Sequence, residues 1–343
     1  MSLADEEFIT MCKDVLSNGC SSKGQKVRAH WPDGTPAYTT AKFGVVNRFD
    51  LSKEFPAVTL RRLAVKSATD ELLWIWQKKS NNIHDLDSHI WDEWADGEGS
   101  IGKAYGYQFA KKHPCKDVTE EGLTKAFPGY LFEEYSAVTA PGCDAEPDNT
   151  GNTGGAMRVC IDTDTGRIAA MRDNNGPWHL DQVDKVIYDL KVNPFSRRII
   201  TTLWDPEELD DMALHPCAGN CVFMVEQRPG HDKLTLNMAL NQRSQDILAA
   251  WAWNTCQYAV LMHMLAQVCG MEVGEMLHTD INCHIYERHI DAIKELMSRQ
   301  PKPAPVFWLN PDVTDFYKFT KNDVKFENYE VSGPQITGIE IAI

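Results

Sequence analysis

The hydrophobic residues of this chain recur at helical spacing in some segments and gather into short β-branched runs in others. Phe8, Met11 and Val15 share one face of a helix predicted over 5–18. The same periodicity predicts further helices over 66–78, 183–190, 247–270 and 290–297. Runs rich in β-branched residues predict a strand that ends near Phe49, another over 198–203, and a strand pair over 222–225 and 234–240. Because helices and strands alternate without a regular strand–helix–strand period, the pattern favours an α+β fold.

The segment 113–177 has a different texture, with fewer regular patterns and more turn residues. The polar stretch 148–155 predicts a flexible loop, and 157–161 with 167–171 predict the two strands of a β-hairpin. Between them, the Asp-x-Asp-x-Gly order of Asp162 to Gly166 is similar to an EF-hand calcium-binding loop. Its glycine comes one position too early, however, and no glutamate ends the loop. Turn chemistry is therefore the better interpretation. We interpret 113–177 as an insertion, of unassigned role, within a single catalytic domain over 1–343.

Bulk composition limits the classes of function. The 343 residues are 43% hydrophobic and 24% charged, which is ordinary for a globular protein. The formal net charge of −15 repels nucleic-acid backbones, so we expect no nucleic-acid partner. Any phosphate ligand must then be held by a local group of arginines.

Compartment and metal content are also constrained. The apolar stretch 247–270 contains Asn254, Gln257, His263 and Gln267, which favours a buried core helix over a membrane span. The N-terminus shows no signal-peptide pattern, and the ten cysteines show no metal-ligand spacing. We therefore expect a cytoplasmic protein with reduced thiols, no bound metal and no membrane partner.

One cysteine stands apart from the others. Cys217 follows a proline between two extended segments, and a thiolate is a strong nucleophile toward an electron-poor carbon. Cysteines are more often simply buried, so the position alone is a weak argument. About two dozen residues later comes Arg243-Ser244, and a guanidinium can donate two hydrogen bonds to a phosphate. His284 and Tyr286 follow as a His-x-Tyr motif.

In this order and spacing, Cys217, Arg243-Ser244 and the His-x-Tyr motif resemble the active site of the thymidylate synthase family. The segments 90–96 and 196–198 and the terminal Ile341-Ala342-Ile343 extend the resemblance to nearly the whole chain outside the insertion. The resemblance implies a large mixed β-sheet packed by helices, with a sheet face forming a homodimer interface. It implies dTMP synthesis from dUMP and 5,10-methylene-tetrahydrofolate, with Cys217 attacking C6 of the pyrimidine.

The resemblance also assigns roles to individual residues. For substrate, it implies phosphate contacts from Arg28, Arg243 and Ser244, phosphate contacts from Arg197 and Arg198 across the dimer axis, base recognition by Asn254, and sugar contacts from His284 and Tyr286. For chemistry and folate, it implies proton transfer by Glu71 and Tyr105, a further catalytic role for Asp246, and folate packing by Ile90, Trp91, Trp94, Asp246, Ala250, Trp253 and Ala342. An amide such as that of Asn254 offers one donor and one acceptor, which matches the uracil edge. Burial of Glu71 beside leucine and tryptophan should raise its pKa toward neutral.

Several positions depart from the family pattern near the predicted site: His215, Ala218, Ala250, Ala252, Trp253 and Asn282. These departures leave open a sister activity, deoxyuridylate hydroxymethylase, in which water replaces hydride. The intact C-terminal Ile341-Ala342-Ile343, the family's lid, favours the synthase because hydride transfer requires exclusion of water. A catalytically silent binding or RNA-regulatory homologue is the third alternative, and the intact Cys217, Glu71 and Arg243 argue against it.

Overall fold

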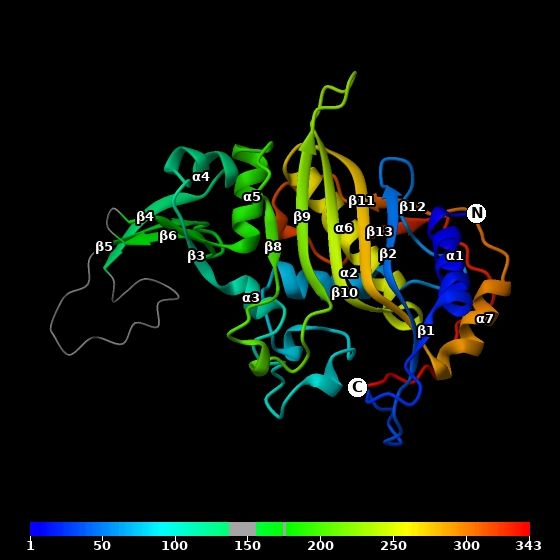
Figure 1. Cartoon of the computed structure of the whole chain (residues 1–343). Helices are drawn as coiled ribbons and strands as arrows, with labels where there is room; N and C mark the ends of the chain where they lie inside the picture. Colours follow the sequence, from blue (N-terminus) through cyan, green and yellow to red (C-terminus); the bar gives the residue numbers. More distant parts are fainter. Residues whose placement is uncertain (137–155, 174–175) are drawn as a thin grey trace.

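A six-stranded mixed sheet forms the centre of the computed structural model, which describes residues 1–136, 156–173 and 176–343 (Figure 1). Its strand order is β1–β2–β11–β10–β9–β8. The strands are β1 (Cys20–Ser21), β2 (Thr39–Asp50), β8 (Ile200–Thr202), β9 (Ala218–Glu226), β10 (Thr235–Asp246) and β11 (Glu272–Tyr286). Only the β10–β11 pair is parallel, and the other pairs are antiparallel. The predicted α+β class is confirmed.

Helices α2 (Val65–Trp76) and α6 (Ala252–Val268) pack against each other behind the sheet, as Figure 1 shows. A π-helical turn, η4 (Ile247–Trp251), leads from β10 into α6, and α6 leads into β11. Helix α6 is buried on nearly every side, so its apolar composition reflects a core position. Among the described residues, no helix is long and apolar enough to cross a membrane.

Helices α1 (Leu3–Asn18) and α7 (Ile290–Ser298) lie at the β2–β11 side of the sheet. The boundaries of α1, α2, α6 and α7 agree with the predicted segments to within a few residues. The strand predicted over 198–203 is shorter in the structure. Strand β11, the longest of the sheet, is not predicted by the hydrophobic pattern.

A second sheet, with strand order β3–β7–β6–β5–β4, lies within 112–181, which is largely the segment predicted to be an insertion. Its elements and their neighbours are β3 (Lys112–Cys115), α4 (Glu120–Ala126), β4 (Leu131–Ser136), β5 (Ala156–Ile161), β6 (Ile168–Asp173), β7 (Trp178–Asp181) and α5 (Gln182–Val192). Short elements elsewhere are α3 (Gly106–Ala110), β12 (Val306–Leu309) and β13 (Val324–Glu327). The domain boundaries of the insertion stay a prediction.

The predicted hairpin is confirmed, because β5 and β6 pair in antiparallel fashion. In its turn, Asp162 accepts hydrogen bonds from the Asp164 amide at 3.0 Å and the Thr165 hydroxyl at 2.9 Å. Gly166 has a φ of 76°, which favours glycine. Turn chemistry therefore accounts for this aspartate-rich segment. The loop predicted over 148–155 lies outside the described residues.

A buried ion cluster ties the insertion to the body of the protein. Asp184 is fully buried, pairs with Arg167, and lies 3.6 Å from the Lys79 ammonium. The Tyr317 hydroxyl donates to Asp184 at 2.8 Å, and the Arg167 guanidinium lies 3.2 Å from the Tyr317 ring centroid. Burial opposes ionisation of Asp184, but Arg167 and Lys79 outweigh it and hold its pKa well below the usual value.

The face of the main sheet opposite α2 and α6 carries exposed hydrophobic side chains. Strand register puts Val222 beside Ile200, and Val46 beside Thr279, on this face. The exposed apolar residues of the face are Val46, Ile200, Val222, Met224 and Ile281, each between 36% and 55% exposed. An apolar sheet face of this kind is typical of a protein–protein interface.

Candidate active site

Cys217 lies immediately before β9 and is held from two sides. Its backbone N–H donates to the Tyr105 hydroxyl at 3.4 Å, and its carbonyl accepts from the Arg243 amide at 2.9 Å. The Arg243 side chain donates to the carbonyls of Pro216 at 3.1 Å and His215 at 2.6 Å. The strand pairing of β9 with β10 thus brings the thiol and the predicted phosphate-binding arginine together.

Burial raises the pKa of the Cys217 thiol, and the positive charges of Arg243 and Arg28 act against that rise. Arg28 itself is exposed, on the loop between β1 and β2. The two arginines therefore stabilise the thiolate, which is the nucleophilic form of the side chain. They also supply a local positive region on an acidic protein.

Tyr105 has an unusual backbone conformation, with φ of 49° and ψ of −108°. Non-glycine residues rarely adopt positive φ, and such strain is often found at functional sites. The next residue must be glycine, because a Cβ on Gly106 would lie 2.1 Å from the Ser80 carbonyl oxygen. The tyrosine ring packs against Trp91 with 4.8 Å between centroids. Burial raises the pKa of Tyr105 well above its usual value.

Glu71 of α2 is buried, with only 7% of its surface exposed. Its carboxylate accepts three hydrogen bonds, from the indole N–H of Trp91 at 2.6 Å, the indole N–H of Trp253 at 2.5 Å, and the Gln257 amide at 2.5 Å. Burial raises the pKa of Glu71, and these three donors limit the rise. The direction predicted from sequence is confirmed.

Asn254 lies in the first turn of α6, half-buried between two glutamines. Its side-chain oxygen accepts from Gln245 at 3.4 Å, and its NH2 group donates to Gln257 at 3.2 Å. Gln257 in turn donates to Glu71, so the predicted base-recognition residue and the predicted proton-transfer residue share one network. Sequence reasoning missed both glutamines as site residues, because the sequence around a polar residue does not reveal its partner in the fold.

Asp246 ends β10 and caps the turn that begins the long helix. Its carboxylate accepts from the amides of Leu248 at 2.9 Å and Ala249 at 3.1 Å. Burial opposes its ionisation, but His289 and His284 outweigh this and lower the pKa of Asp246. Reciprocally, burial lowers the pKa of His289 but Asp246 outweighs it, giving a net rise. His289 is a third residue that sequence reasoning missed.

His284 and Tyr286 lie at the end of β11, on the same edge of the sheet as Asp246. Their rings meet edge to face at 5.0 Å, and His284 bonds to the Asn282 side chain at 3.0 Å. Burial lowers the pKa of His284. Trp31 closes the cluster, with its ring 5.4 Å from Tyr286.

The C-terminal segment is attached beside this cluster. Ile343 and His30 exchange two backbone hydrogen bonds, at 2.8 and 3.0 Å. The Glu340 carboxylate accepts from Arg288 at 2.6 Å, and the Glu340 carbonyl lies 2.9 Å from His289 Nε2. The tail that contains Ala342 is therefore connected through His289 to Asp246.

The remaining predicted residues lie at the edges of this arrangement. Trp94 contacts Trp91 with 5.5 Å between ring centroids, and Ile90 is 40% exposed. Ser244 and Ala250 are half-buried near Asp246 in the chain. Arg197 and Arg198 are exposed before β8, and no ion pair joins either guanidinium to another described residue.

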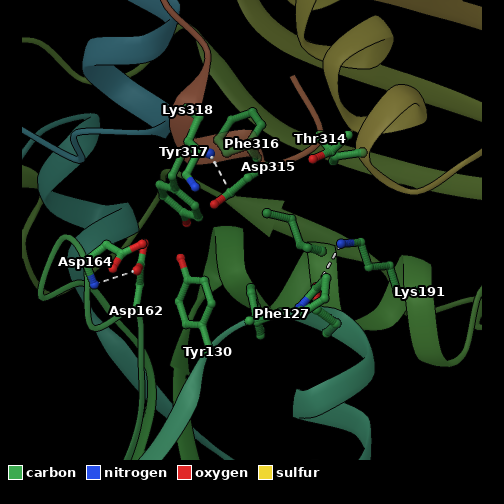
Figure 2. A pocket seen from close by; sticks show the side chains of 15 residues that line it. Phe127, Tyr130, Asp162, Asp164, Lys191, Thr314, Asp315, Phe316, Tyr317 and Lys318 are labelled. Carbon is green, nitrogen blue, oxygen red and sulfur yellow. Dashed lines mark hydrogen bonds between the residues drawn. The ribbon is translucent and has the colours of Figure 1, made fainter. Parts of the chain in front are cut away.

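Other candidate sites are weaker. The described residues contain no group of three or more His, Cys, Asp or Glu side chains that could hold a metal ion. A cavity of about 180 Å³ lies between the insertion and the body, and Figure 2 shows Asp162, Tyr130 and Lys191 around it. Lys191 donates to the Ala126 carbonyl there, at 2.8 Å. None of the predicted site residues lines this cavity.

A nucleophilic thiol beside two arginines, with a buried carboxylate and a tyrosine nearby, defines an enzyme-like site on a mixed sheet. The family model for thymidylate synthase matches residues 6–342. The chain is 37% identical over 334 residues to thymidylate synthase 1 of Bacillus subtilis strain 168, and 36% identical to the thymidylate synthase of Bacillus phage phi3T, covering 96% of each chain in both comparisons. It also superposes on the solved thermostable thymidylate synthase A of Bacillus subtilis, with a TM-score of 0.73 and 36% identity over 99% of both chains. The chain belongs to the thymidylate synthase family.

Proposed function

We propose that this protein is a thymidylate synthase that converts dUMP to dTMP with 5,10-methylene-tetrahydrofolate. The observation that carries the proposal is the placement of Cys217 beside Arg243, Arg28 and Tyr105. The Tyr105 ring in turn packs against Trp91, which donates to Glu71. Family membership supports the same chemistry. No metal takes part in the proposed reaction.

In the proposed reaction, the Cys217 thiolate attacks C6 of the pyrimidine and forms a carbon–sulfur bond. The electron pair displaced from the C5–C6 double bond makes C5 nucleophilic. Arg243, Ser244 and Arg28 hold the phosphate, while His284 and Tyr286 bind the sugar hydroxyl. Tyr105 and Glu71 transfer the protons, because burial raises the pKa of the Glu71 carboxyl and so makes it a better proton acceptor and a possible proton donor.

Methylene-tetrahydrofolate supplies the one-carbon unit and the hydride when bound. Trp91 and Trp94 offer aromatic surface beside Glu71, and the exposed Ile90 extends it, which fits a flat, partly apolar co-substrate. Trp253, Ala250 and Ala342 complete the proposed folate contacts, and Asp246 is proposed to bind a polar edge of the folate ring. Its lowered pKa keeps Asp246 an acceptor.

The dimer is part of the proposal, because Arg197 and Arg198 have no ionic partner among the described side chains of their own chain. The exposed apolar face of the main sheet provides a surface for a second copy. We infer an isologous dimer in which each copy's Arg197 and Arg198 reach the partner's phosphate site. Mixing Cys217→Ser with Arg198→Ala protein tests this, because one site of the mixed dimer then has both functional groups. Recovery of activity supports the shared site, and no recovery despite subunit exchange contradicts it.

Deoxyuridylate hydroxymethylase is the second candidate, favoured by Ala218, Ala250 and Ala252 around the site. The attached C-terminal tail favours the synthase, because Ile343 and Glu340 hold it beside the site, where it can exclude water. Product analysis after incubation with dUMP and methylene-tetrahydrofolate separates the two. We expect dTMP and dihydrofolate in equal amounts. A product with the mass of 5-hydroxymethyl-dUMP and no dihydrofolate would establish the hydroxymethylase instead.

A catalytically silent homologue is the third candidate, and trapping tests it directly. With 5-fluoro-dUMP and methylene-tetrahydrofolate, the fluorine cannot leave C5 as a proton would, so the covalent complex should persist. Intact-mass spectrometry should find the adduct on wild-type protein and none on Cys217→Ser. An adduct on another cysteine would remove Cys217 from the proposed mechanism.

A further inference from the structure

The turn that carries the nucleophile, His215-Pro216-Cys217, accepts hydrogen bonds at all three of its carbonyls. The Arg243 side chain donates to the carbonyl of His215 at 2.6 Å and to that of Pro216 at 3.1 Å. The Arg243 amide donates to the Cys217 carbonyl at 2.9 Å. A further donor comes from a residue that has no part in the proposed reaction, because the Trp204 indole N–H donates to the Pro216 carbonyl at 3.0 Å.

Trp204 lies two residues after the end of β8, and its backbone is held in place there. Its amide donates to the Thr202 hydroxyl at 3.2 Å. The side chain of Gln182, the first residue of α5, exchanges two hydrogen bonds with the Thr202 backbone, at 2.7 and 2.9 Å. The strand and the helix therefore fix the backbone from which the half-buried indole reaches the turn.

Two side chains of the site also lie against the Trp204 ring. The guanidinium carbon of Arg243 lies 5.9 Å from the ring centroid, within the range of a cation–π contact. The His215 ring meets the indole edge to face, with 6.0 Å between centroids and an interplanar angle of 76°. His215 is one of the positions that depart from the family pattern. These contacts limit the rotation of the indole and so keep its N–H directed at the turn.

The Pro216 carbonyl is the group on which this arrangement depends. Proline has no N–H, so the carbonyl is the only backbone group through which hydrogen bonds can hold Pro216. Its two lone pairs accept from Arg243 Nε and from Trp204 Nε1. Arg243 is also the proposed phosphate ligand, and its remaining N–H groups are available for that role. Trp204 is therefore the donor that can hold the turn independently of the phosphate.

We propose that Trp204 is a positioning residue that acts through the Pro216 carbonyl and sets where the Cys217 sulfur meets C6 of the substrate. The inference rests on the proposed function, in which Cys217 attacks the pyrimidine. Attack requires the reacting atoms to lie about 3–3.5 Å apart with their orbitals aligned, and rotation of the peptide before Cys217 moves the sulfur. The indole N–H makes no proposed contact with dUMP or folate. Its removal should therefore slow formation of the carbon–sulfur bond and leave dUMP binding nearly unchanged.

Two replacements of Trp204 test the role of its N–H group. Trp204→Phe keeps an aromatic ring and removes the donor. Replacement of Trp204 by benzothienylalanine, in which sulfur takes the place of the indole N–H, keeps the size of the ring as well. In both proteins, the rate of covalent adduct formation with 5-fluoro-dUMP and methylene-tetrahydrofolate should fall about fivefold, a factor typical of one hydrogen bond between uncharged groups. KM for dUMP should change by less than about twofold.

Trp178→Phe is the matched control, because it makes the same chemical change in a buried ring of the second sheet. The Trp178 ring packs against Phe132, with 5.9 Å between centroids, and against the Arg172 guanidinium at 4.6 Å. The control should lower thermal stability and leave the adduct rate at the wild-type value. Rapid quenching followed by intact-mass spectrometry measures the adduct rate, and thermal unfolding of every variant accompanies it.

The outcomes separate this inference from the proposed function. Wild-type protein that forms neither dTMP nor the adduct would overturn both. Wild-type protein that forms both, with the two Trp204 replacements reacting at its rate, would overturn the inference alone, as would a raised KM for dUMP with an unchanged adduct rate. Slow adduct formation in both replacements would support the inference even if the product is 5-hydroxymethyl-dUMP, because the covalent step comes first. If Trp204→Phe does not fold, the benzothienylalanine protein decides, because its ring fills the same volume.

Discussion

The hydrogen bond from Trp253 to Glu71 leads to a quantitative prediction about the pH dependence of catalysis. The indole N–H lies 2.5 Å from Glu71 Oε2 and is one of three donors to this buried carboxylate. Trp253→Phe keeps an aromatic ring but removes the donor. A hydrogen bond to a charged group contributes about 1.5–3 kcal/mol. Since one pKa unit corresponds to about 1.4 kcal/mol, the pKa of Glu71 should rise by roughly one unit or more.

The sign of the effect follows from the direction of the existing shift. Burial already raises the pKa of Glu71 in the folded protein, and losing a donor to the ionised form raises it further. The limb of the kcat/KM profile that requires ionised Glu71 should therefore move to higher pH. The pH dependence of the free energy of unfolding should also move to higher pH. A raised folded-state pKa means that stability is lost as pH rises from the unfolded-state pKa through the folded-state pKa, and the variant extends this window upward.

The assay is the pH profile of kcat/KM for dUMP, measured for wild type, Trp253→Phe and Trp308→Phe. Trp308 is the matched control, because its ring is half-buried on β12 and packs against the Lys325 ammonium at 4.5 Å, with no link to Glu71. Thermal unfolding at neutral and at acidic pH accompanies the profiles. An unshifted profile in Trp253→Phe, or an equal shift in Trp308→Phe, would refute the assignment of this donor to Glu71.

Three further predictions concern the rest of the molecule. Asp184→Asn leaves Arg167 buried without its partner and should lower the free energy of unfolding by about 3–5 kcal/mol; an unchanged urea midpoint would contradict the role of the ion cluster. Met224→Lys places a charge on the exposed apolar sheet face and should convert the proposed dimer to monomer by light scattering, with activity lost in parallel. Arg288→Ala removes the ion pair that holds Glu340 and should raise KM for the folate about twofold to fivefold, with little change for dUMP; equal changes in both would argue against a tail that closes over the folate.

Local periodicity was sufficient for much of the secondary structure. The apolar faces of α1, α2 and α7 recur at intervals of three and four residues, and such faces form wherever a core is available. The hairpin β5–β6 was equally predictable, because Asp162 and Gly166 satisfy a local turn. The motif residues Cys217, Arg243 and Glu71 could be named from sequence because their spacing is shared with a family.

Strand β11 shows where local pattern fails. Its core-facing positions include His278, Asp280 and His284. This central strand therefore lacks the alternation of apolar and polar residues from which a strand is predicted. Of these three, His278 is hydrogen-bonded by residues distant in sequence. Thr255 on α6 and Gln242 on β10 are the partners of His278.

What the sequence determined by itself was therefore the longer helices, the turn residues and the set of candidate reactive side chains. Tertiary structure decided the strand order, the three donors around Glu71, and the direction in which the amide of Asn254 points. The physical reason is the sequence separation over which the interactions act. Helical faces and turns depend on residues a few positions apart, whereas a buried polar group depends on a partner that only the folded sheet brings within hydrogen-bonding distance.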